Sequence, residues 1–458
     1  MYNDDPWEEE ENDDDLTKEA VERFEQMLED HRTDYFDTEE FELIIDYYLQ
    51  QNNLERSRAA VDLALEQHPD DLDIRIKNGY YHASAGNHQK AIDIYTQALA
   101  ELADDERGEM YYAIGYEYQN LGFCSKAIEY YKKSLNSGPD NIHFNSAFVD
   151  LISCYLNTGK IQEGIDYFNQ RIEENPQEAE SWSALGDLYR RLDRLEEAIE
   201  MYEYVLAIDP THIWANMHLA NSYYDLDRFQ EAIDSLNEAL AHDVETSMIH
   251  ASLGDCHYRM GHYIDARDEY NKALSMNEML TEAWSGLGYV YSDLGDSTKA
   301  IKYFNKAYEL EPFNDDHLYN LAAEYRKTND CEEALKCLLE IEMRQPNDPD
   351  LYFFLGDLLA EMGRMDEGIC YLKVGLERTD NDYTLLYLLA YLYLERGDRQ
   401  TALGYLEQAL TANPEYYKDF IEYNPELISN DVAVMELIDR FARHCEERRA
   451  TERRSKPT

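Results

Sequence analysis

The sequence predicts an all-α solenoid of about eleven helix-turn-helix repeats, each about 34 residues long, with capping helices at both ends. Residues 179–210 match residues 281–312 after three shifts of 34, so that Trp182 meets Trp284. Eleven units of this kind begin at residues 38, 72, 108, 145, 179, 213, 247, 281, 315, 349 and 383. A single helix pair cannot bury its apolar face, so stacked pairs are expected to share a continuous core.

Each unit is expected to contain two helices joined by a tight turn. The eighth and twentieth positions are small in most units, as at Gly186 and Ala198, and small residues let two helices approach closely. Aromatic residues such as Tyr189 and Tyr202 surround them, so much of the excess of 39 tyrosines is expected to be structural. The fifteenth position is Gly, Asn or Asp in every unit, which suits the left-handed residue that ends a helix.

The two ends of the chain differ from the repeats. The first fifteen residues carry nine acids and no base, and such a segment is expected to be disordered. The spacing of Ala20, Phe24 and Met27 copies the second helix of a unit and indicates a capping half-repeat. The predicted order is an acidic disordered tail, an N-terminal capping helix or half-repeat, the solenoid, C-terminal capping helices and a basic disordered tail, at residues 1–15, 16–37, 38–416, 417–447 and 448–458.

The charge balance restricts the partners that the chain can bind. Lys and Arg number 41 against 96 Asp and Glu, which gives a net charge of −55. This excess argues against binding to nucleic-acid phosphates or to anionic membranes, and it favours basic protein partners. No apolar run approaches the ~18 to 20 residues of a membrane helix, and no export signal is recognised. The scattered cysteines indicate free thiols, so a cytoplasmic protein is expected.

No motif for catalysis, a cofactor or a metal is recognised in the sequence. It contains no phosphate-binding P-loop, no GxGxxG, no HExxH and no GxSxG. His82 and His257 occupy a tyrosine packing position, and His257 and His262 flank a turn without sharing a helix face. A non-enzymatic protein without a cofactor or a metal site is therefore expected.

The repeated pattern over residues 38–416 resembles the tetratricopeptide repeat (TPR) family. The resemblance implies a right-handed superhelical solenoid whose concave groove is lined by the second, fifth, ninth, twelfth and thirteenth positions of each first helix. The second position is acidic in seven of the eleven units, and the fifth and ninth hold no Lys or Arg. The lysine of the TPR carboxylate clamp is replaced by Met217, although Asn221 matches its asparagine, so that clamp is not expected. The candidate partner-binding residues of the groove are Tyr80, Tyr112, Tyr116, Asp187, Asp255, Tyr289, Tyr319, Phe353, Asp357, Tyr387 and Tyr391.

An acidic, tyrosine-lined groove suits a Lys/Arg-rich protein segment with apolar anchors, because a guanidinium can stack on tyrosine while it pairs with a carboxylate. The expected function is therefore a protein-interaction scaffold or adaptor. The alternative that the acids only keep a long solenoid soluble stays open. An acidic chaperone for basic clients, a regulatory subunit of a separately encoded enzyme, and a homodimer formed through the terminal helices also stay open.

Overall fold

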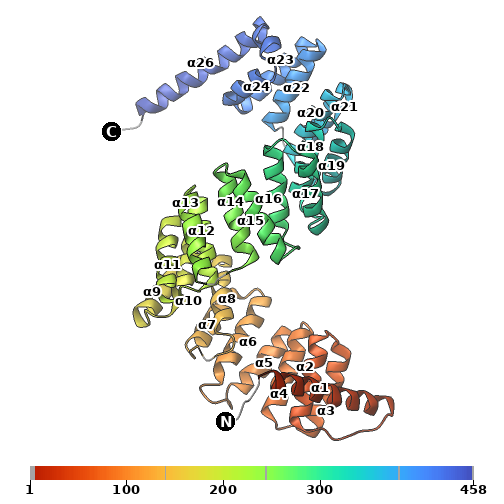
Figure 1. The fold of residues 1–458 in the computed structure, drawn as a ribbon, viewed down its shortest axis with the longest axis vertical. Helices are drawn as coiled ribbons and strands as arrows, with labels where there is room; N and C mark the ends of the chain where they lie inside the picture. The colour runs from red at the N-terminus through yellow and green to blue at the C-terminus, as the bar shows by residue number, and fades with distance from the viewer. Residues whose placement is uncertain (1–5, 140, 243–244, 380–381, 456–458) are drawn as a thin grey trace. The chain divides into compact units, whose positions relative to one another are not determined.

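The protein is an all-α chain of tandem helix pairs. A computed structural model describes residues 6–139, 141–242, 245–379 and 382–455, with side chains from Asp15 to Arg443 within these ranges. These residues contain helices and no strand, which confirms the predicted fold class (Figure 1). Two compact units, Met1–Val244 and Glu245–Thr458, divide the chain, and each is described by itself. Within the described ranges, no helix has the length and apolar character required to cross a membrane.

Consecutive helices run back and forth within each unit (Figure 1). The first unit contains α1 (Pro6–Glu29), α2 (Thr38–Gln50), α3 (Leu54–Gln67), α4 (Leu72–Ser84), α5 (His88–Ala98), α6 (Arg107–Asn120), α7 (Cys124–Leu135), α8 (Phe144–Asn157), α9 (Ile161–Glu174), α10 (Ala179–Arg191), α11 (Leu195–Ile208), α12 (Ile213–Asp225) and α13 (Phe229–Ala241). The second unit contains α14 (Ser247–Arg259), α15 (Tyr263–Met276), α16 (Thr281–Asp293), α17 (Ser297–Leu310), α18 (Asp315–Lys327), α19 (Cys331–Arg344), α20 (Pro349–Glu361), α21 (Met365–Arg378), α22 (Tyr383–Arg396), α23 (Arg399–Ala412), the short 3-10 helix η1 (Pro414–Tyr416), α24 (Tyr417–Tyr423), α25 (Pro425–Ser429) and α26 (Val432–Ser455).

The turn inside each repeat depends on one left-handed residue. The first helix of every pair begins at, or one residue before, the unit start read from the sequence. The fifteenth residue of each repeat then has a positive φ, between 52° and 88°, which reverses the chain direction into the second helix. These residues are Asn52, Gly86, Gly122, Gly159, Asp193, Asp227, Gly261, Gly295, Asn329, Gly363 and Gly397.

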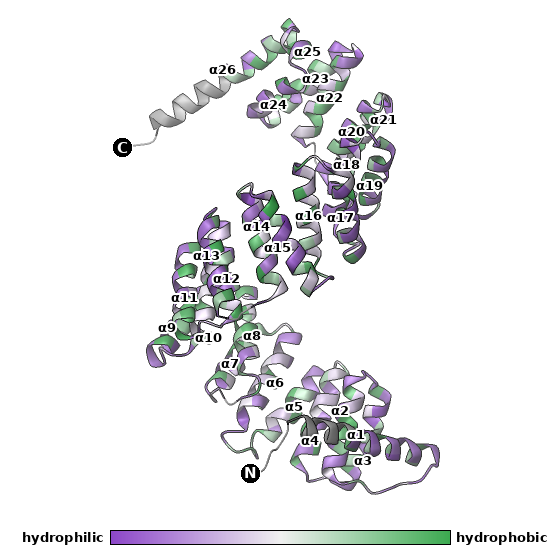
Figure 2. Ribbon diagram, in the orientation of Figure 1, coloured by the Kyte–Doolittle hydropathy of each residue, from purple (hydrophilic) through white to green (hydrophobic). Residues whose placement is uncertain are grey.

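In five of the eleven repeats, the core is built around a glycine that faces an aromatic ring. A Cβ atom on Gly254 would lie 2.6 Å from Cε1 of Tyr270, and one on Gly288 would lie 2.5 Å from Cε1 of Phe304. Both rings are buried, so the glycines let the two helices close on them. Polar and apolar residues share each helix, so one side can face this core (Figure 2). Six repeats depart from this pair. Three carry alanine and leucine at the two positions, and the other three carry Ile45 and Val61, Ile152 and Phe168, and Gly356 and Leu372.

The N-terminal helix is longer than the sequence predicts. Ala20, Phe24 and Met27 are buried, as expected for a capping half-repeat, and Tyr48 donates a hydrogen bond of 2.6 Å to Glu25. However, α1 begins at Pro6 rather than near residue 16, so the described part of the acidic segment is helical instead of disordered. Proline is well suited to a first helical position, and acidic residues near a helix N-terminus interact favourably with the helix dipole. Residues 1–5 lie outside the described part of the chain.

The C-terminal cap also differs from its prediction. One short and one long helix are expected after the last repeat, whereas the structure contains η1, α24, α25 and α26. Phe420, Ile428, Val434 and Ile438 are buried and close the core at this end. Helix α26 continues to Ser455, beyond the predicted end at residue 447, in keeping with the high helix propensity of its Arg, Glu and Ala residues. The last part of the predicted disordered tail, residues 456–458, lies outside the described chain.

We predict that Gly288→Ala destabilises the protein, because the added methyl group must displace the buried ring of Phe304. The expected loss is roughly 1 to 3 kcal/mol in the free energy of unfolding, measured by urea titration. Gly404→Ala is the matched control, since it also lies inside a helix but its Cβ would meet no atom within 4 Å. That control is expected to be neutral or to gain up to about 1 kcal/mol from helix propensity. Equal effects of the two variants would contradict this account of the core.

Candidate protein-binding groove

A cavity of about 420 Å³ lies between the first helices of three successive repeats in the first unit, α8, α10 and α12. Phe148, Val149 and Trp214 give it an apolar lining, and Glu180 and Asp187 give it an acidic one. None of the described residues that line it is Lys or Arg. The Val149 side chain is 67% exposed and Trp214 is 62% exposed, which is unusual for residues of this size. The cavity therefore joins exposed apolar surface to unneutralised carboxylates.

The acidic side of this cavity is held in place by aromatic neighbours. Tyr202 donates a hydrogen bond of 2.6 Å to Asp187, whose carboxylate also lies 3.8 Å from Nε2 of His218. The His218 ring stacks against Tyr202 on one side and Trp214 on the other, with centroid separations of 5.6 and 6.1 Å. Burial lowers the pKa of His218, although Asp187 opposes this shift, so the imidazole is neutral near pH 7. The cavity consequently keeps its negative charge.

A second cavity, of about 350 Å³, lies between α14, α16 and α18 in the second unit. Asp255, Glu282, Glu311 and Asp316 contribute four carboxyl groups to its lining, and Tyr289 contributes an aromatic edge. The Tyr270 hydroxyl donates a hydrogen bond of 2.6 Å to Asp255. Burial raises the pKa of the Asp255 carboxyl to about 6; Glu282 adds to the shift and the bond from Tyr270 opposes it. A cationic group placed here would relieve the cost of ionising Asp255.

Three of the tyrosines selected from the sequence tie one repeat to the next. The hydroxyl of Tyr80 donates to Glu109, that of Tyr112 donates to Asp150 at 2.8 Å, and that of Tyr319 donates to Asp348 at 2.7 Å. These hydroxyls are thus engaged within the chain. By contrast, Tyr116 and Tyr289 are 45% and 38% exposed, and the Tyr289 hydroxyl accepts a hydrogen bond from Asn320.

The chain covers part of its own groove near the C-terminus. Tyr387 is only 1% exposed, its hydroxyl donates to the carbonyl of Asn413 at 2.8 Å, and its ring packs against Tyr416 and Phe420. The segment η1–α24 supplies both of these rings. Tyr387 is therefore a core residue beneath the cap rather than an open contact site.

The other three candidate residues at this end also have partners within the chain. Phe353 and Tyr391 lie 6.2 and 5.5 Å from the ring of Tyr423, between centroids. Asp357 forms an ion pair of 2.8 Å with Arg326. A partner would have to displace these contacts to use this part of the groove.

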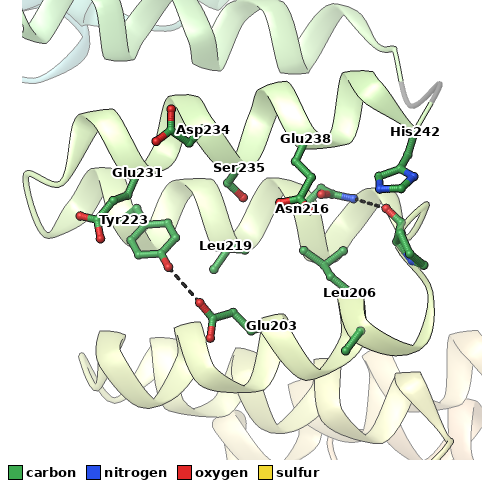
Figure 3. A pocket seen from close by; sticks show the side chains of 12 residues that line it. Glu203, Leu206, Asn216, Leu219, Tyr223, Glu231, Asp234, Ser235, Glu238 and His242 are labelled. Carbon is green, nitrogen blue, oxygen red and sulfur yellow. Dashed lines mark hydrogen bonds between the residues drawn. The ribbon is translucent and has the colours of Figure 1, made fainter.

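Another cavity, of about 440 Å³, lies among α11, α12 and α13 (Figure 3). Glu231, Asp234 and Glu238 line it from α13, and Glu203 lines it from α11. Tyr223 donates a hydrogen bond of 3.0 Å to Glu203, and burial together with this bond raises the pKa of Tyr223 to about 12. This cavity is acidic, but none of the large hydrophobic residues that are exposed in the described chain lines it.

The first cavity contains residues that the sequence analysis missed. Trp214 stands at the second position of its repeat, where most units carry an acid, so its departure from the acidic pattern was a readable signal. Val149 occupies the fifth position of its repeat, which the family resemblance assigns to the groove, so it could also have been found. His218 occupies the sixth position, and its contact with the cavity depends on how three helices stack. Similarly, the spacing of His257 and His262 indicates that they share no helix face, and it therefore predicts no common site. The turn between α14 and α15 nevertheless brings the two side chains together.

We predict that Asp255→Asn stabilises the protein at pH 8 by roughly 1 to 3 kcal/mol, measured by thermal or urea unfolding. The pKa of this carboxyl is raised to about 6 in the folded state, so its ionisation opposes folding above that pH. The gain should shrink as the pH falls below about 6 and vanish near pH 4. Asp187→Asn, which alters the equivalent tyrosine bond, controls for the hydrogen-bond change itself. A gain that is constant with pH would contradict burial of the charge as its cause.

Comparison with known proteins places the chain among curated relatives that it matches only in part. It is 26% identical over 109 residues to the photosystem I assembly protein Ycf3 of Prochlorococcus marinus subsp. pastoris, covering 23% of this chain and 63% of the relative. It is 23% identical over 103 residues to the protein of the same name from Synechococcus sp. (strain CC9605), covering 22% of this chain and 60% of that relative. The chain thus spans less than two thirds of the length of these relatives.

Solved structures of repeat proteins are also similar. The APC/C heterotetramer Cut9–Hcn1 is matched with a TM-score of 0.42 and 15% identity, over 78% of this chain and 96% of the other. YrrB, a TPR protein with an unusual peptide-binding site, is matched with a TM-score of 0.32 and 26% identity, over 39% of this chain and 93% of the other.

Family models give the most extensive match. Those described as tetratricopeptide repeat match residues 43–106, 108–141, 150–213, 190–256, 281–314, 319–383 and 385–415. The matched repeats form protein-interaction scaffolds, and no catalytic domain is among them. Because these matches together cover most of the sequence, the chain belongs to the tetratricopeptide repeat family.

Proposed function

We propose that this protein is a non-enzymatic scaffold that binds a Lys/Arg-rich, partly apolar protein segment in the cavity between α8, α10 and α12. The observation that carries the proposal is the pairing of exposed Trp214 and Val149 with the carboxylates of Glu180 and Asp187 in one cavity. A segment with both apolar and cationic side chains satisfies both parts of this lining at once. A purely apolar segment would leave the acids without a partner, and a purely basic one would leave the tryptophan exposed.

The chemistry of the cavity favours arginine and lysine over other polar groups. A cation over an indole face contributes roughly 0.5 to 2 kcal/mol, depending on how far it is desolvated. The same guanidinium can form a charge-assisted hydrogen bond to a neighbouring carboxylate. His218 is neutral near pH 7, so it does not compete for Asp187 as a cation. Aromatic anchors in such pockets commonly dominate the binding energy of protein interfaces.

The acidic cavity of the second unit supports the same preference for a basic segment. Its four carboxyl groups have no Lys or Arg among the described lining residues, and ionised Asp255 is costly without a cation. We also propose a cytoplasmic location, supported by the six cysteines with described side chains, all of which are free. Cys445 lies outside the described side chains. A homodimer through the terminal helices stays a prediction.

We predict that Glu180→Lys weakens binding of a fluorescein-labelled peptide in which Arg alternates with Leu, measured by fluorescence anisotropy. The expected loss is about tenfold in Kd, or about 1.4 kcal/mol, because attraction at this point becomes repulsion. Glu196→Lys is the matched control: it makes the same charge change at an exposed position of α11 that does not line the cavity. If both variants weaken binding equally, net charge rather than this cavity accounts for the interaction.

We further predict that Trp214→Ala weakens the same peptide about tenfold, since an anchor of this kind typically contributes more than 1 kcal/mol. Its side chain is largely exposed, so little loss of folding stability is expected, and circular dichroism checks this. A peptide in which Gln replaces each Leu should lose affinity for the unaltered protein and be insensitive to Trp214→Ala. Undiminished binding of the Arg/Leu peptide to Trp214→Ala would exclude the cavity as the binding site.

A further inference from the structure

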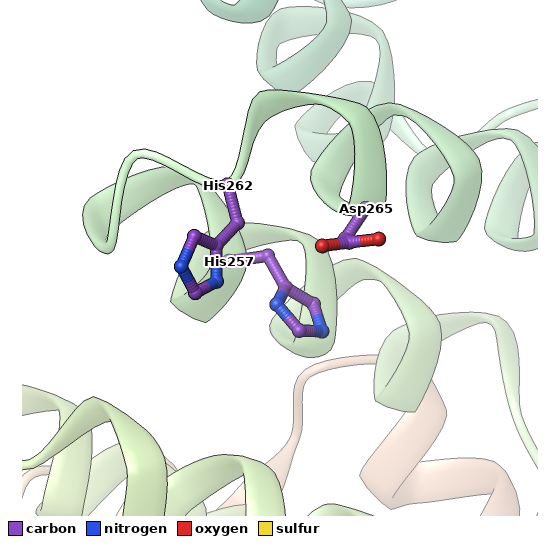
Figure 4. A group of neighbouring side chains, drawn as sticks. All are labelled: His257, His262 and Asp265. Carbon is purple, nitrogen blue, oxygen red and sulfur yellow. The ribbon is translucent and has the colours of Figure 1, made fainter.

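Two imidazoles and a carboxylate meet at the turn of the seventh repeat (Figure 4). His257 lies in the last turns of α14, His262 directly precedes α15, and Asp265 lies in the first turn of α15. The turn at Gly261, with φ 76°, folds α15 back, and the backbone N–H of His262 donates to the carbonyl of His257 at 2.8 Å. One ligand atom from each side chain then lies within 4.8 Å of the other two.

In other repeats, the residues at the same three positions form a recurring contact that includes a positively charged Arg or Lys side chain. In the fifth repeat, Arg194 lies 4.5 Å from the centroid of the Tyr189 ring and pairs with Glu197 at 2.6 Å. The equivalent residues of the sixth repeat are Tyr223, Arg228 and Glu231, and those of the eighth are Tyr291, Asp296 and Lys299; both sets form the same cation–ring and ion-pair contacts. The geometry at this turn therefore brings a ring, a cation and a carboxylate together.

In the seventh repeat the cation is absent and the ring is an imidazole. Within the described residues, Asp265 has no ion-pair partner, and Nδ1 of His257 is buried without a hydrogen-bond partner. Among the eleven repeats, only the seventh carries histidine both at the position of His257 and at the position of His262. The second repeat provides a comparison, because His82 occupies the position of His257 but is followed by Asn87 and Lys90 rather than by ligands.

We propose that His257, His262 and Asp265 bind a divalent ion of the zinc class, which takes the place that an arginine or lysine occupies at this turn in other repeats. Two imidazole nitrogens favour Zn²⁺ and similar transition metals over Mg²⁺ or Ca²⁺, which prefer oxygen ligands. Tetrahedral zinc with ligands at about 2.0 to 2.2 Å requires ligand atoms about 3.4 Å apart. His262 and Asp265 are exposed, so their side chains can rotate by the small distance that this requires. Water would complete the coordination.

Bound metal would link the end of α14 to the start of α15. An ion that binds the folded chain more tightly than the unfolded chain raises its stability. Because the ligands must lose their protons, and the turn must already be formed, the site couples metal binding to the folding of this repeat.

The experiment measures Zn²⁺ binding to the full chain by isothermal titration, with Co²⁺ absorption as a second readout. His262→Arg is the test variant, because it places at this turn the residue that the fifth and sixth repeats already carry, beside Asp265. We expect one Zn²⁺ equivalent with a micromolar or lower Kd to be lost, or weakened at least tenfold, in His262→Arg. The tetrahedral Co²⁺ absorption and the Zn²⁺-induced rise in Tm should disappear with it, while circular dichroism stays unchanged.

His82→Tyr is the matched control, since it removes a histidine from the equivalent position of a repeat that lacks the other two ligands. This variant should keep the full zinc stoichiometry and the Tm shift. The proposal is overturned if the unaltered chain binds no Zn²⁺ at micromolar concentrations. It is equally overturned if His262→Arg keeps the same number of sites and the same affinity.

Discussion

The close approach of the two helices within a repeat is the constraint on which the rest of this structure depends, and in five of the eleven repeats a glycine beneath a large ring makes it possible. A glycine such as Gly254 leaves no side chain between α14 and the ring of Tyr270. The ring therefore crosses the helix pair, and its hydroxyl reaches the carboxylate of Asp255 at the groove. The fifth repeat repeats this arrangement with Tyr202 and Asp187. Packing inside a repeat thus sets the position of these two acids, and burial in the same place raises the pKa of Asp255.

The acids of the groove have two physical consequences that oppose each other within the free chain. Together with the other acidic residues of the chain, they make the protein strongly anionic, which favours solubility. Where they are buried, as at Asp255, their ionisation costs folding free energy. A cationic group beside Asp255 would lower this cost, which is why the proposed partner is basic. Under the proposed function, exposed apolar residues such as Trp214 would select among basic segments. Near the C-terminus, the chain's own Tyr416 and Phe420 cover Tyr387.

The backbone of the turn between the two helices is the same in each repeat, whereas the side chains on it differ. Its left-handed residue and its backbone hydrogen bonds recur from unit to unit, so three side chains are always brought to the same place. Arg194 and Glu197 use this geometry for an ion pair over a ring, whereas His257, His262 and Asp265 present metal ligands there. A repeat protein can acquire a new site in this way without any change in its fold, because only the side chains at these positions differ.

The sequence by itself determined the all-α fold, the helix pairs and the positions of the turns, because these depend on local signals. The period of 34 residues and the left-handed turn residues are readable without any knowledge of distant contacts. Only the tertiary structure decided which side chains meet, across repeats and around the turn within a repeat. The bond from Tyr112 to Asp150, the covering of Tyr387 and the approach of His257 to His262 all depend on how helices stack or reverse. Composition likewise favoured disorder for the first acidic residues, whereas α1 begins at Pro6, because helix-end electrostatics offset part of the cost of ordering them. Candidate groove residues could thus be chosen by periodicity. Their exposure to solvent could not be predicted in this way, since it depends on packing between elements far apart in the chain.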